Sequence, residues 1–260
     1  MRMIQSESMD KRLRNRIANC LHEHTPMADD FLGFEQVIDS DFAKFFLDKM
    51  GFKWRGNTRD VIAAIDQITD EAEWHDVYTM VERFAYSLEE DQIDAFAATL
   101  SDVLDEEKAG YKLIIIDEND KQCLIVPLTN NLELNEVDAA CHTKYDSVNN
   151  NIETAIRLFS DRKNPDYTNA VKSATSAVES ASCIVDDKAK TLGEAIKRLK
   201  KSGTGINQRL IEGLEKLYAY ANETVRHGTS EPIEITQSET RLMIVTCSAI
   251  ANFILAEYDG

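Results

Sequence analysis

Between Thr168 and Val185 the chain reads Thr-Asn-Ala-Val-Lys-Ser-Ala-Thr-Ser-Ala-Val-Glu-Ser-Ala-Ser-Cys-Ile-Val. Apolar residues recur in it every three or four positions, which is the period of one face of an α-helix. The residues of this stripe are small or β-branched: Val171, Ala174, Val178, Ala181 and Val185. Because small side chains let two helix axes approach closely, the stretch predicts a helix that is packed tightly against its neighbours.

Helical patterns flank this stretch on both sides. Residues 152–160 and 206–220 each carry an apolar stripe, and Thr191-Leu-Gly-Glu194 and Thr236-Gln-Ser-Glu239 each match a capping box at a helix start. The second box opens a pattern that runs to about residue 256 and is apolar over much of its circumference, so we expect a central buried helix there. Together these segments predict an antiparallel helical bundle with short loops.

The first half of the chain is also mainly helical in pattern. Amphipathic periods predict helices at 10–22, 61–68, 72–88 and 93–104. Two short β-rich runs follow, at 111–116 and 122–126, and the polar turn between them predicts a β-hairpin. The expected fold is therefore mainly α, with a helical N-terminal domain at 1–140 that carries the hairpin and a helical bundle at 141–260.

Charge is divided unevenly between these two expected domains. Residues 1–140 carry 14 basic and 30 acidic side chains, a net charge of −16, whereas residues 141–260 carry 15 basic and 16 acidic side chains, a net charge of −1. An acidic surface repels nucleic acid, so a phosphate-facing surface is expected in the second domain. The candidate RNA-backbone patch is Lys197, Arg198, Lys200 and Lys201. The same basic residues also suit an ordinary helix C-terminus, where they complement the helix dipole.

Several other classes of protein do not fit the sequence. The five cysteines are far apart and form no Cys-x-x-Cys pair, which is typical of buried free thiols in a reducing cytoplasm. No secretory leader opens the chain and no apolar run approaches the roughly 20 residues that span a bilayer, so we expect a cytoplasmic protein without membrane contact. There is no phosphate-binding loop, and His22 and His24 would point apart on a helix, so neither a cofactor nor a metal site is expected.

The stretch Tyr218-Ala-Tyr-Ala-Asn-Glu-Thr-Val-Arg-His-Gly228 carries the strongest candidate chemistry. It places His227 beside Arg226 near the end of a helix. Histidine can transfer a proton at neutral pH, and arginine can hold a phosphate or the charge that develops on it. Such a pair fits metal-free cleavage of RNA. The alternative is structural, since Arg-His-Gly is a common tripeptide and Gly228 also suits a simple helix end.

Six stretches, read together, point to a known family. They are residues 4–15, 106–112, 161–169, 176–180, 191–195 and 217–228, which include Ser176-Ala-Val-Glu-Ser180 and Thr191-Leu-Gly-Glu-Ala195. In order and spacing they resemble a bacterial abortive-infection protein of the AbiJ type, which carries a HEPN-like helical domain at its C-terminus. The resemblance covers nearly the whole chain.

The resemblance implies a small helical bundle that dimerises and, in active members, cuts RNA without metal through an R-x(4–6)-H motif repeated across the dimer. In such a site histidine moves the proton of the 2′-hydroxyl or of the leaving 5′-oxygen, and arginine stabilises the charge on the phosphoryl oxygens. Here Ala221 and Asn222 stand where that arginine would lie, and Arg226 directly precedes His227. Adjacent helical side chains diverge by about 100°, so the two share one phosphate only if the helix breaks or two subunits contribute.

On this basis we expect His227 to act as acid and base and Arg226 as the phosphate clamp, with Asn222 and Glu179 as orienting residues. Glu179 could instead form a structural pair with Arg226 across the bundle. The resulting hypothesis is an anti-phage protein whose C-terminal domain is a metal-independent endoribonuclease toxin, acting as a homodimer on host or phage RNA. The alternative is a non-catalytic dimerisation or RNA-binding module, with the acidic N-terminal domain as a sensor or protein-binding surface for a phage trigger.

Overall fold

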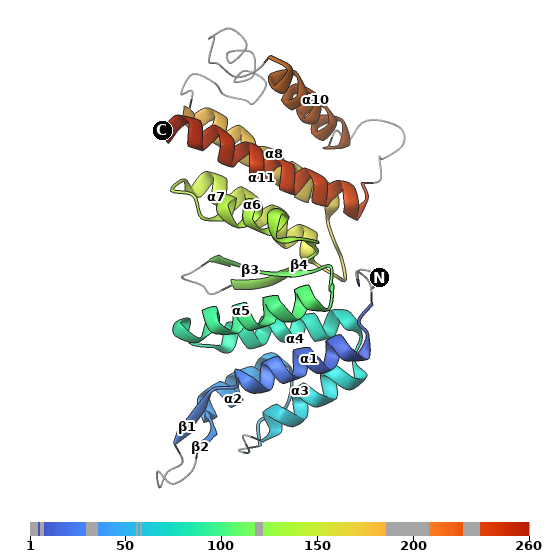
Figure 1. Cartoon of the computed structure of the whole chain (residues 1–260), viewed down its shortest axis with the longest axis vertical. Coiled ribbons are helices and arrows are strands. Elements are labelled where there is room, and N and C mark those ends of the chain that lie inside the picture. Colours follow the sequence, from blue (N-terminus) through green and yellow to red (C-terminus); the bar gives the residue numbers. More distant parts are fainter. Residues whose placement is uncertain are drawn as a thin grey trace. The chain divides into compact units, whose positions relative to one another are not determined.

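Figure 1 shows a computed structural model of the chain, which describes residues 5, 8–29, 36–55, 57, 59–117, 122–185, 208–225 and 235–259. Ten helices and two antiparallel strand pairs are found in this part of the chain, which confirms the expected mainly α fold. The chain divides into two compact units, Met1–Asn130 and Asn131–Gly260.

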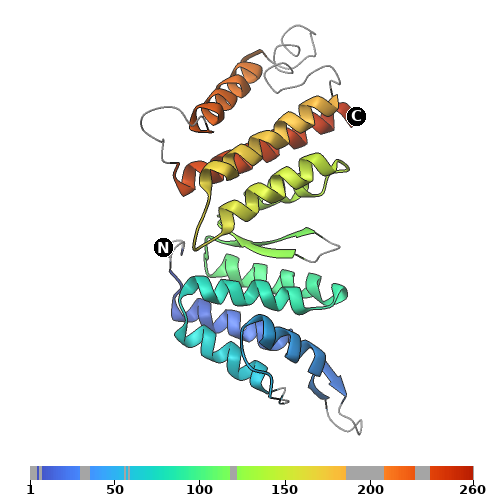
Figure 2. The same cartoon turned by 180° about the vertical axis from the view of Figure 1, so that it is seen from behind.

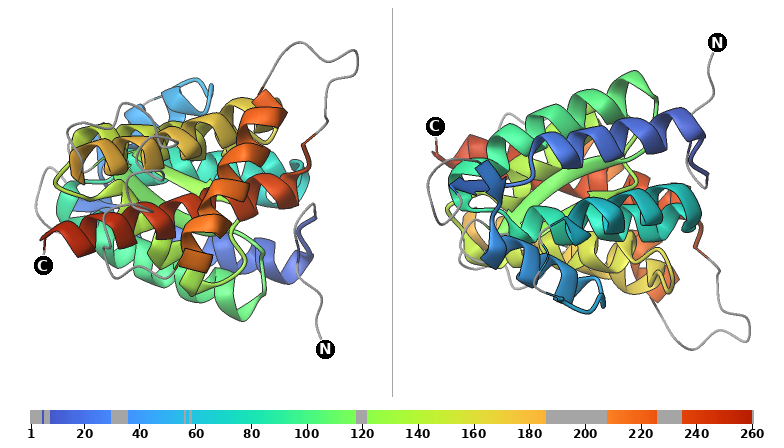
Figure 3. Two further views of the ribbon diagram at one scale, coloured as in Figure 1. Left: turned by 90° about the horizontal axis from the view of Figure 1, so that it is seen from above. Right: turned by 90° about the horizontal axis from the view of Figure 1, so that it is seen from below.

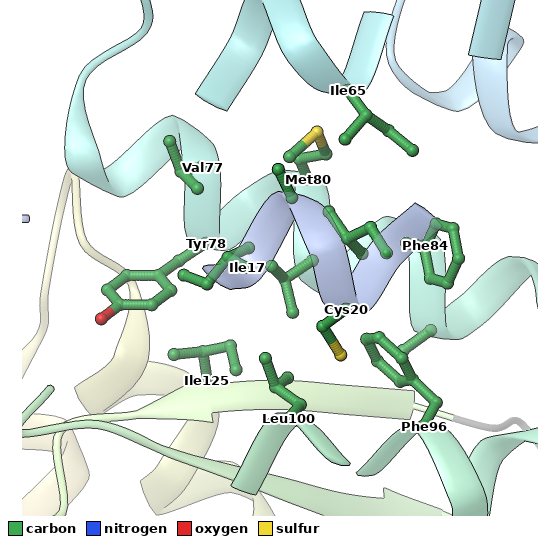
Figure 4. Close-up of a cluster of buried hydrophobic side chains, with 14 of the residues drawn as sticks. Ile17, Cys20, Ile65, Val77, Tyr78, Met80, Phe84, Phe96, Leu100 and Ile125 are labelled. Atoms are coloured by element: carbon green, nitrogen blue, oxygen red, sulfur yellow. The ribbon is translucent and has the colours of Figure 1, made fainter. Parts of the chain in front are cut away.

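The described part of the first unit contains five helices and a β-hairpin. The helices are α1 (Lys11–Glu23), α2 (Ser40–Lys49), α3 (Asp60–Glu71), α4 (Trp74–Ser87) and α5 (Glu90–Glu106). In the core, Ile17 and Cys20 of α1 lie among side chains from three other helices, namely Ile65 of α3, Phe84 of α4 and Leu100 of α5 (Figure 4). Because each buried aliphatic or aromatic side chain contributes about 1.5–3 kcal/mol, this contact surface holds the helices around α1.

The β-hairpin lies where the sequence predicts it. β3 (Lys112–Asp117) pairs antiparallel with β4 (Gln122–Val126). A two-stranded ribbon is marginally stable alone, so it depends on the helices that cover it. β3 packs on α5 and β4 on α4, where the Ile125 N–H donates a hydrogen bond to the Glu82 carboxylate at 2.8 Å.

The sequence does not predict the second strand pair. β1 (Met27–Asp29) pairs antiparallel with β2 (Gln36–Ile38). Strands of three residues are too short to show an alternating pattern of polar and apolar side chains. β2 leads directly into α2, whose first turn is capped by Asp39, since its carboxylate accepts a hydrogen bond from the Phe42 N–H at 2.8 Å.

The second unit is a helical bundle built around α8. Its described helices are α6 (Asn131–Cys141), α7 (Asp146–Ser160), α8 (Tyr167–Val185), α10 (Gln208–Val225) and α11 (Gln237–Asp259). α8 packs against both α7 and α11, and α6 covers α7 and α11 (Figure 2). The predicted stripe of small residues on α8 is buried from Val171 to Ala181 and partly exposed at Val185, which confirms the expected close packing.

The helices of this bundle do not all alternate in direction. α7 and α8 are antiparallel because the short segment 161–166 joins them. α8 and α11 run in the same direction in Figures 1 and 2, because the chain passes through α10 between them. The antiparallel arrangement expected for the bundle therefore holds for the first pair and not for the second. Seen from above, α10 crosses α8 rather than running along it (Figure 3).

The structure divides the chain before α6 rather than after it. The sequence interpretation ends the first domain at residue 140, whereas the contacts assign Asn131–Gly260 to one unit. α6 packs on α11, where the Asn252 side-chain amide donates hydrogen bonds to the Glu136 carbonyl at 3.0 Å and to its carboxylate at 3.1 Å. Charge does not reveal this contact, because α6 carries three acidic side chains and no basic one, and so resembles the acidic first unit in charge.

The predicted apolar helix near the C-terminus is α11, and its capping box is formed. The Glu239 N–H donates to Thr236 Oγ1 at 3.2 Å, and the Thr236 N–H donates back to Glu239 Oε2 at 2.9 Å. In the part of the chain that the structure describes, α11 is the one helix long and apolar enough to cross a membrane. Its most apolar stretch of 18 residues, within Gln237–Ala256, is 44% buried inside the protein. Leu242 is exposed on the outer face of α11. The helix is therefore buried on one side only, whereas the sequence predicts a central buried helix. The other capping box, at 191–194, lies outside the described residues.

The cysteines are free thiols and four of the five are buried. Burial raises the pKa of Cys20, Cys123 and Cys247 to about 12, so these thiols stay protonated near neutral pH. Protonated, inaccessible thiols are poor nucleophiles, which assigns these side chains to the core.

Replacing Ala174 by leucine tests the close packing of α8. Ala174 is fully buried, so the added methylenes should force α7 and α11 apart and destabilise the second unit by about 1–3 kcal/mol. Urea unfolding followed by circular dichroism measures the loss. Lys172→Leu, at an exposed site on the same helix, is the matched control and should change the stability by less than about 0.5 kcal/mol. Equal effects of the two substitutions would contradict the packing.

The α11 capping box should make the stability of the second unit depend on acid pH. Hydrogen bonds from the Thr236 side chain and backbone lower the pKa of Glu239 below its ordinary value of 4.5. A lowered pKa stabilises the fold above the ordinary value, and the contribution is lost as pH falls through the lowered one. The urea midpoint of Glu239→Ala should therefore lie below that of wild type at pH 7, and the two should converge at pH 2–3. A difference that persists in acid would contradict the ionised cap.

Candidate functional site

The described residues expected to take part in chemistry lie on α8 and α10. The Tyr218 hydroxyl of α10 donates a hydrogen bond to Glu179 Oε1 of α8 at 3.1 Å, and both side chains are half-buried. Tyr218 faces α8 because Leu214 and Ala221, four residues before it and three after it, are buried on the same face of α10. The bond ties α10 to α8 across the bundle.

Glu179 therefore points toward the helix that leads to the other predicted site residues. Asn222 lies one helical turn after Tyr218, and α10 ends at Val225. The remaining candidates lie outside the described residues: Arg226, His227, Lys197, Arg198, Lys200 and Lys201. The described partner of Glu179 is Tyr218, and its pairing with Arg226 stays a prediction.

Ala221 gives a physical reason for the displaced arginine. Its side chain is only 3% exposed, on the face of α10 that packs against α8. A guanidinium at this position would be buried between two helices and would push them apart. Position 221 therefore does not accommodate an arginine without moving α10 away from α8.

Two tyrosines of α10 join the candidate residues, although the sequence interpretation gives them no role. Tyr218 holds Glu179, and the Tyr220 hydroxyl is buried with no hydrogen-bond partner among the described residues. Burial, and then the negative charge of Glu239, raise the pKa of Tyr220 above its ordinary value of 10.0. The raised pKa keeps the Tyr220 phenol protonated near pH 7. The Tyr-Ala-Tyr spacing is the sequence signal that could have identified them.

The described residues hold no candidate metal centre. No group of three or more His, Cys, Asp or Glu side chains gathers closely enough there to bind an ion. His22 and His24, at the C-terminal end of α1, point apart as expected. His22 Nε2 lies 3.1 Å from the Asp66 carboxylate of α3, and His24 Nε2 lies 3.0 Å from Thr99 Oγ1 of α5.

In the first unit a buried carboxylate holds the N-terminal segment against the end of α5. The Glu107 side chain is fully buried, and its Oε1 lies 2.9 Å from both Arg12 Nε and Arg16 Nη1. Gln5 adds hydrogen bonds to the carbonyl oxygens of Glu107 and Lys108, at 3.0 and 2.9 Å. Gln5 and the start of α1 therefore lie beside the end of α5, and these parts of two segments that carry the family resemblance form one structural cluster.

This cluster lies within a region that a known family shares. A family model described as AbiJ N-terminal domain 4 matches residues 2–143. The chain belongs to this family. Membership in the AbiJ family associates the chain with abortive-infection defence. No curated protein and no solved structure matches the chain.

The AbiJ N-terminal domain and the first structural unit end at different places. The family match runs through α6 to residue 143, whereas α6 packs with the second unit. The sequence that defines the AbiJ domain therefore includes a helix that completes the following bundle. The match does not reach α7, α8, α10 or α11, so it does not test whether that bundle is HEPN-like.

A double-mutant cycle measures the contact between Tyr218 and Glu179. Tyr218→Phe removes one hydrogen bond to a carboxylate and should destabilise the second unit by about 0.5–1.5 kcal/mol, and Glu179→Gln should show coupling to it of similar size. Tyr220→Phe is the matched control, because its hydroxyl has no described partner to lose. Equal losses for the two tyrosine variants, or zero coupling, would contradict the contact.

Proposed function

We propose that the second unit is a metal-independent endoribonuclease of HEPN type, which acts as a toxin and homodimer on host or phage RNA during abortive infection. His227 is the general acid and base, and Arg226 holds the phosphate. Asn222 and Glu179 orient them, and the basic segment 197–201 contacts the RNA backbone. The observation that carries the proposal is the Tyr218–Glu179 bond, which fixes the helix that runs directly into Arg226 and His227.

Electrostatics support RNA as the substrate of this unit. The second unit, residues 131–260, carries 15 basic and 19 acidic side chains, a net charge of −4, against −13 for residues 1–130, so it repels a polyanion less than the first unit does. Basic side chains can then act locally on phosphate without a long-range barrier. The half-buried phenol of Tyr218, whose hydroxyl donates to Glu179, lies one helical turn from Asn222.

An apolar face on α11 supports the homodimer. Leu242 is 61% exposed and Phe253 is 38% exposed, and their spacing of eleven positions corresponds to about three helical turns, so both lie on one face. Val245 and Ala249 are partly exposed between them. A second copy that covers this stripe would remove its apolar side chains from water. A dimer also allows Arg226 of one copy to hold the phosphate while His227 of the other copy transfers the proton of the attacking 2′-hydroxyl.

One observation favours a second candidate function. Ala221 and Asn222 occupy the positions expected for the family arginine, and Ala221 is buried, so a site assembled from a single helix is incomplete. In this alternative the bundle only dimerises or binds RNA. The acidic N-terminal unit then acts as the sensor, or as the surface that meets a phage trigger or another protein partner. Both alternatives place the protein in the cytoplasm, where buried free thiols remain reduced.

Cleavage assays with His227→Ala separate the two candidates. Purified protein is incubated with total RNA in the presence of EDTA, and the proposal predicts cleavage that resists the chelator and falls at least about 100-fold in the variant, as expected for loss of a general acid or base. His142→Ala is the matched control, since His142 is exposed on the same unit. RNA binding without cleavage in wild type would support the alternative. Cleavage unchanged in His227→Ala would contradict the proposed site.

A further inference from the structure

A groove of about 710 Å³ opens at one end of the first unit. Three segments line it: Pro26 and Met27 where β1 begins, the first turns of α2, and the turn between α4 and α5. The residues that matter for recognition are Met27, Asp39, Asp41, Phe45, Tyr86 and Glu89, and we call this surface the acidic groove. Its volume lies within the range of about 300–1,000 Å³ that is typical of ligand pockets.

Aromatic and apolar side chains in this groove are open to solvent. Met27, Phe45 and Tyr86 are 52%, 40% and 44% exposed. The rings of Phe45 and Tyr86 stack with their centroids 5.8 Å apart. Three large apolar side chains exposed together on a structured surface indicate a place where another apolar group binds, since they gain nothing from hydration.

The same two rings already accept a positive charge. The Lys49 ammonium lies 5.0 Å from the centroid of the Phe45 ring and 5.7 Å from that of Tyr86. Lys49 is not one of the residues that line the groove. Aromatic rings attract cations through the negative charge density on their faces, which accounts for the position of Lys49 against them.

The charged residues of the groove all carry negative charge. Asp39, Asp41 and Glu89 are among its lining residues, and the described lining includes no lysine, arginine or histidine. Asp39 and Glu89 also cap α2 and α5, and Asp41 is an exposed residue in the first turn of α2. Residues 1–130, which form this unit, carry 14 basic and 27 acidic side chains, a net charge of −13. A phosphate or nucleic acid would be repelled here, whereas a cationic ligand would be attracted.

We propose that the acidic groove binds a basic peptide segment of another protein. An apolar side chain of that segment packs on Met27, Phe45 and Tyr86, and a flanking arginine or lysine pairs with Asp41 and its neighbouring carboxylates. The apolar surface provides affinity, and the acidic rim provides the selection for positive charge. This interaction does not depend on the ribonuclease proposed for the second unit.

Selection from a random dodecapeptide display library, with the full-length protein as bait, tests the groove. The proposal predicts enrichment of peptides that combine at least one aromatic or aliphatic residue with flanking arginine or lysine. The best such peptide, labelled with fluorescein, should then bind wild type in a fluorescence anisotropy titration. Its dissociation constant should rise at least tenfold for Asp41→Lys and for Tyr86→Ser.

Asp102→Lys is the matched control for Asp41→Lys, because it makes the same charge change at an exposed acidic residue of α5 outside the groove. It should change the dissociation constant less than threefold, which separates the groove from the general acidity of the unit. Circular dichroism melts confirm that the variants fold. Enrichment of acidic peptides, no enrichment, or equal weakening by Asp41→Lys and Asp102→Lys would overturn the proposal.

Discussion

Close packing along α8 is the constraint on which the second unit depends. Its small buried residues, such as Ala174 and Ala181, allow α7 and α11 to approach the same helix. Once α8 is enclosed in this way, only a limited face is left for α10, which is held there by Leu214, Ala221 and the Tyr218–Glu179 hydrogen bond. Packing against α8 therefore fixes the position of α10. The sequence that contains Arg226 and His227 follows directly after α10.

The first unit follows a different physical plan. Its large aromatic and aliphatic core surrounds α1, and the buried Glu107 carboxylate fixes the N-terminal segment through Arg12 and Arg16. Partners of a buried charge must stay in place, because an unpaired carboxylate inside the protein is costly. The family match to the AbiJ N-terminal domain covers this unit. Its acidic surface and aromatic groove are the features that support the proposed binding of a basic peptide.

Patterns that extend over several turns could be predicted from the sequence. The α8 stripe, the β3–β4 hairpin and the Thr236–Glu239 cap all depend on local spacing, which the sequence displays directly. Three features could not be predicted from the sequence: the β1–β2 pair, the packing of α6 with the second unit, and the Tyr218–Glu179 bond. Each depends on residues distant in the chain or on elements of only three residues. The acidic groove was missed for the same reason, since it is assembled from three separate segments.

The ends of the RNA fragments test the central claim most directly. If His227 activates a 2′-hydroxyl for attack on the neighbouring phosphate, the reaction breaks the bond to the 5′-oxygen and leaves a 2′,3′-cyclic phosphate and a 5′-hydroxyl. Mass spectrometry of fragments made by the purified protein in EDTA should show these two ends. Fragments that end in a 3′-hydroxyl and a 5′-phosphate, or RNA that stays intact, would contradict the account.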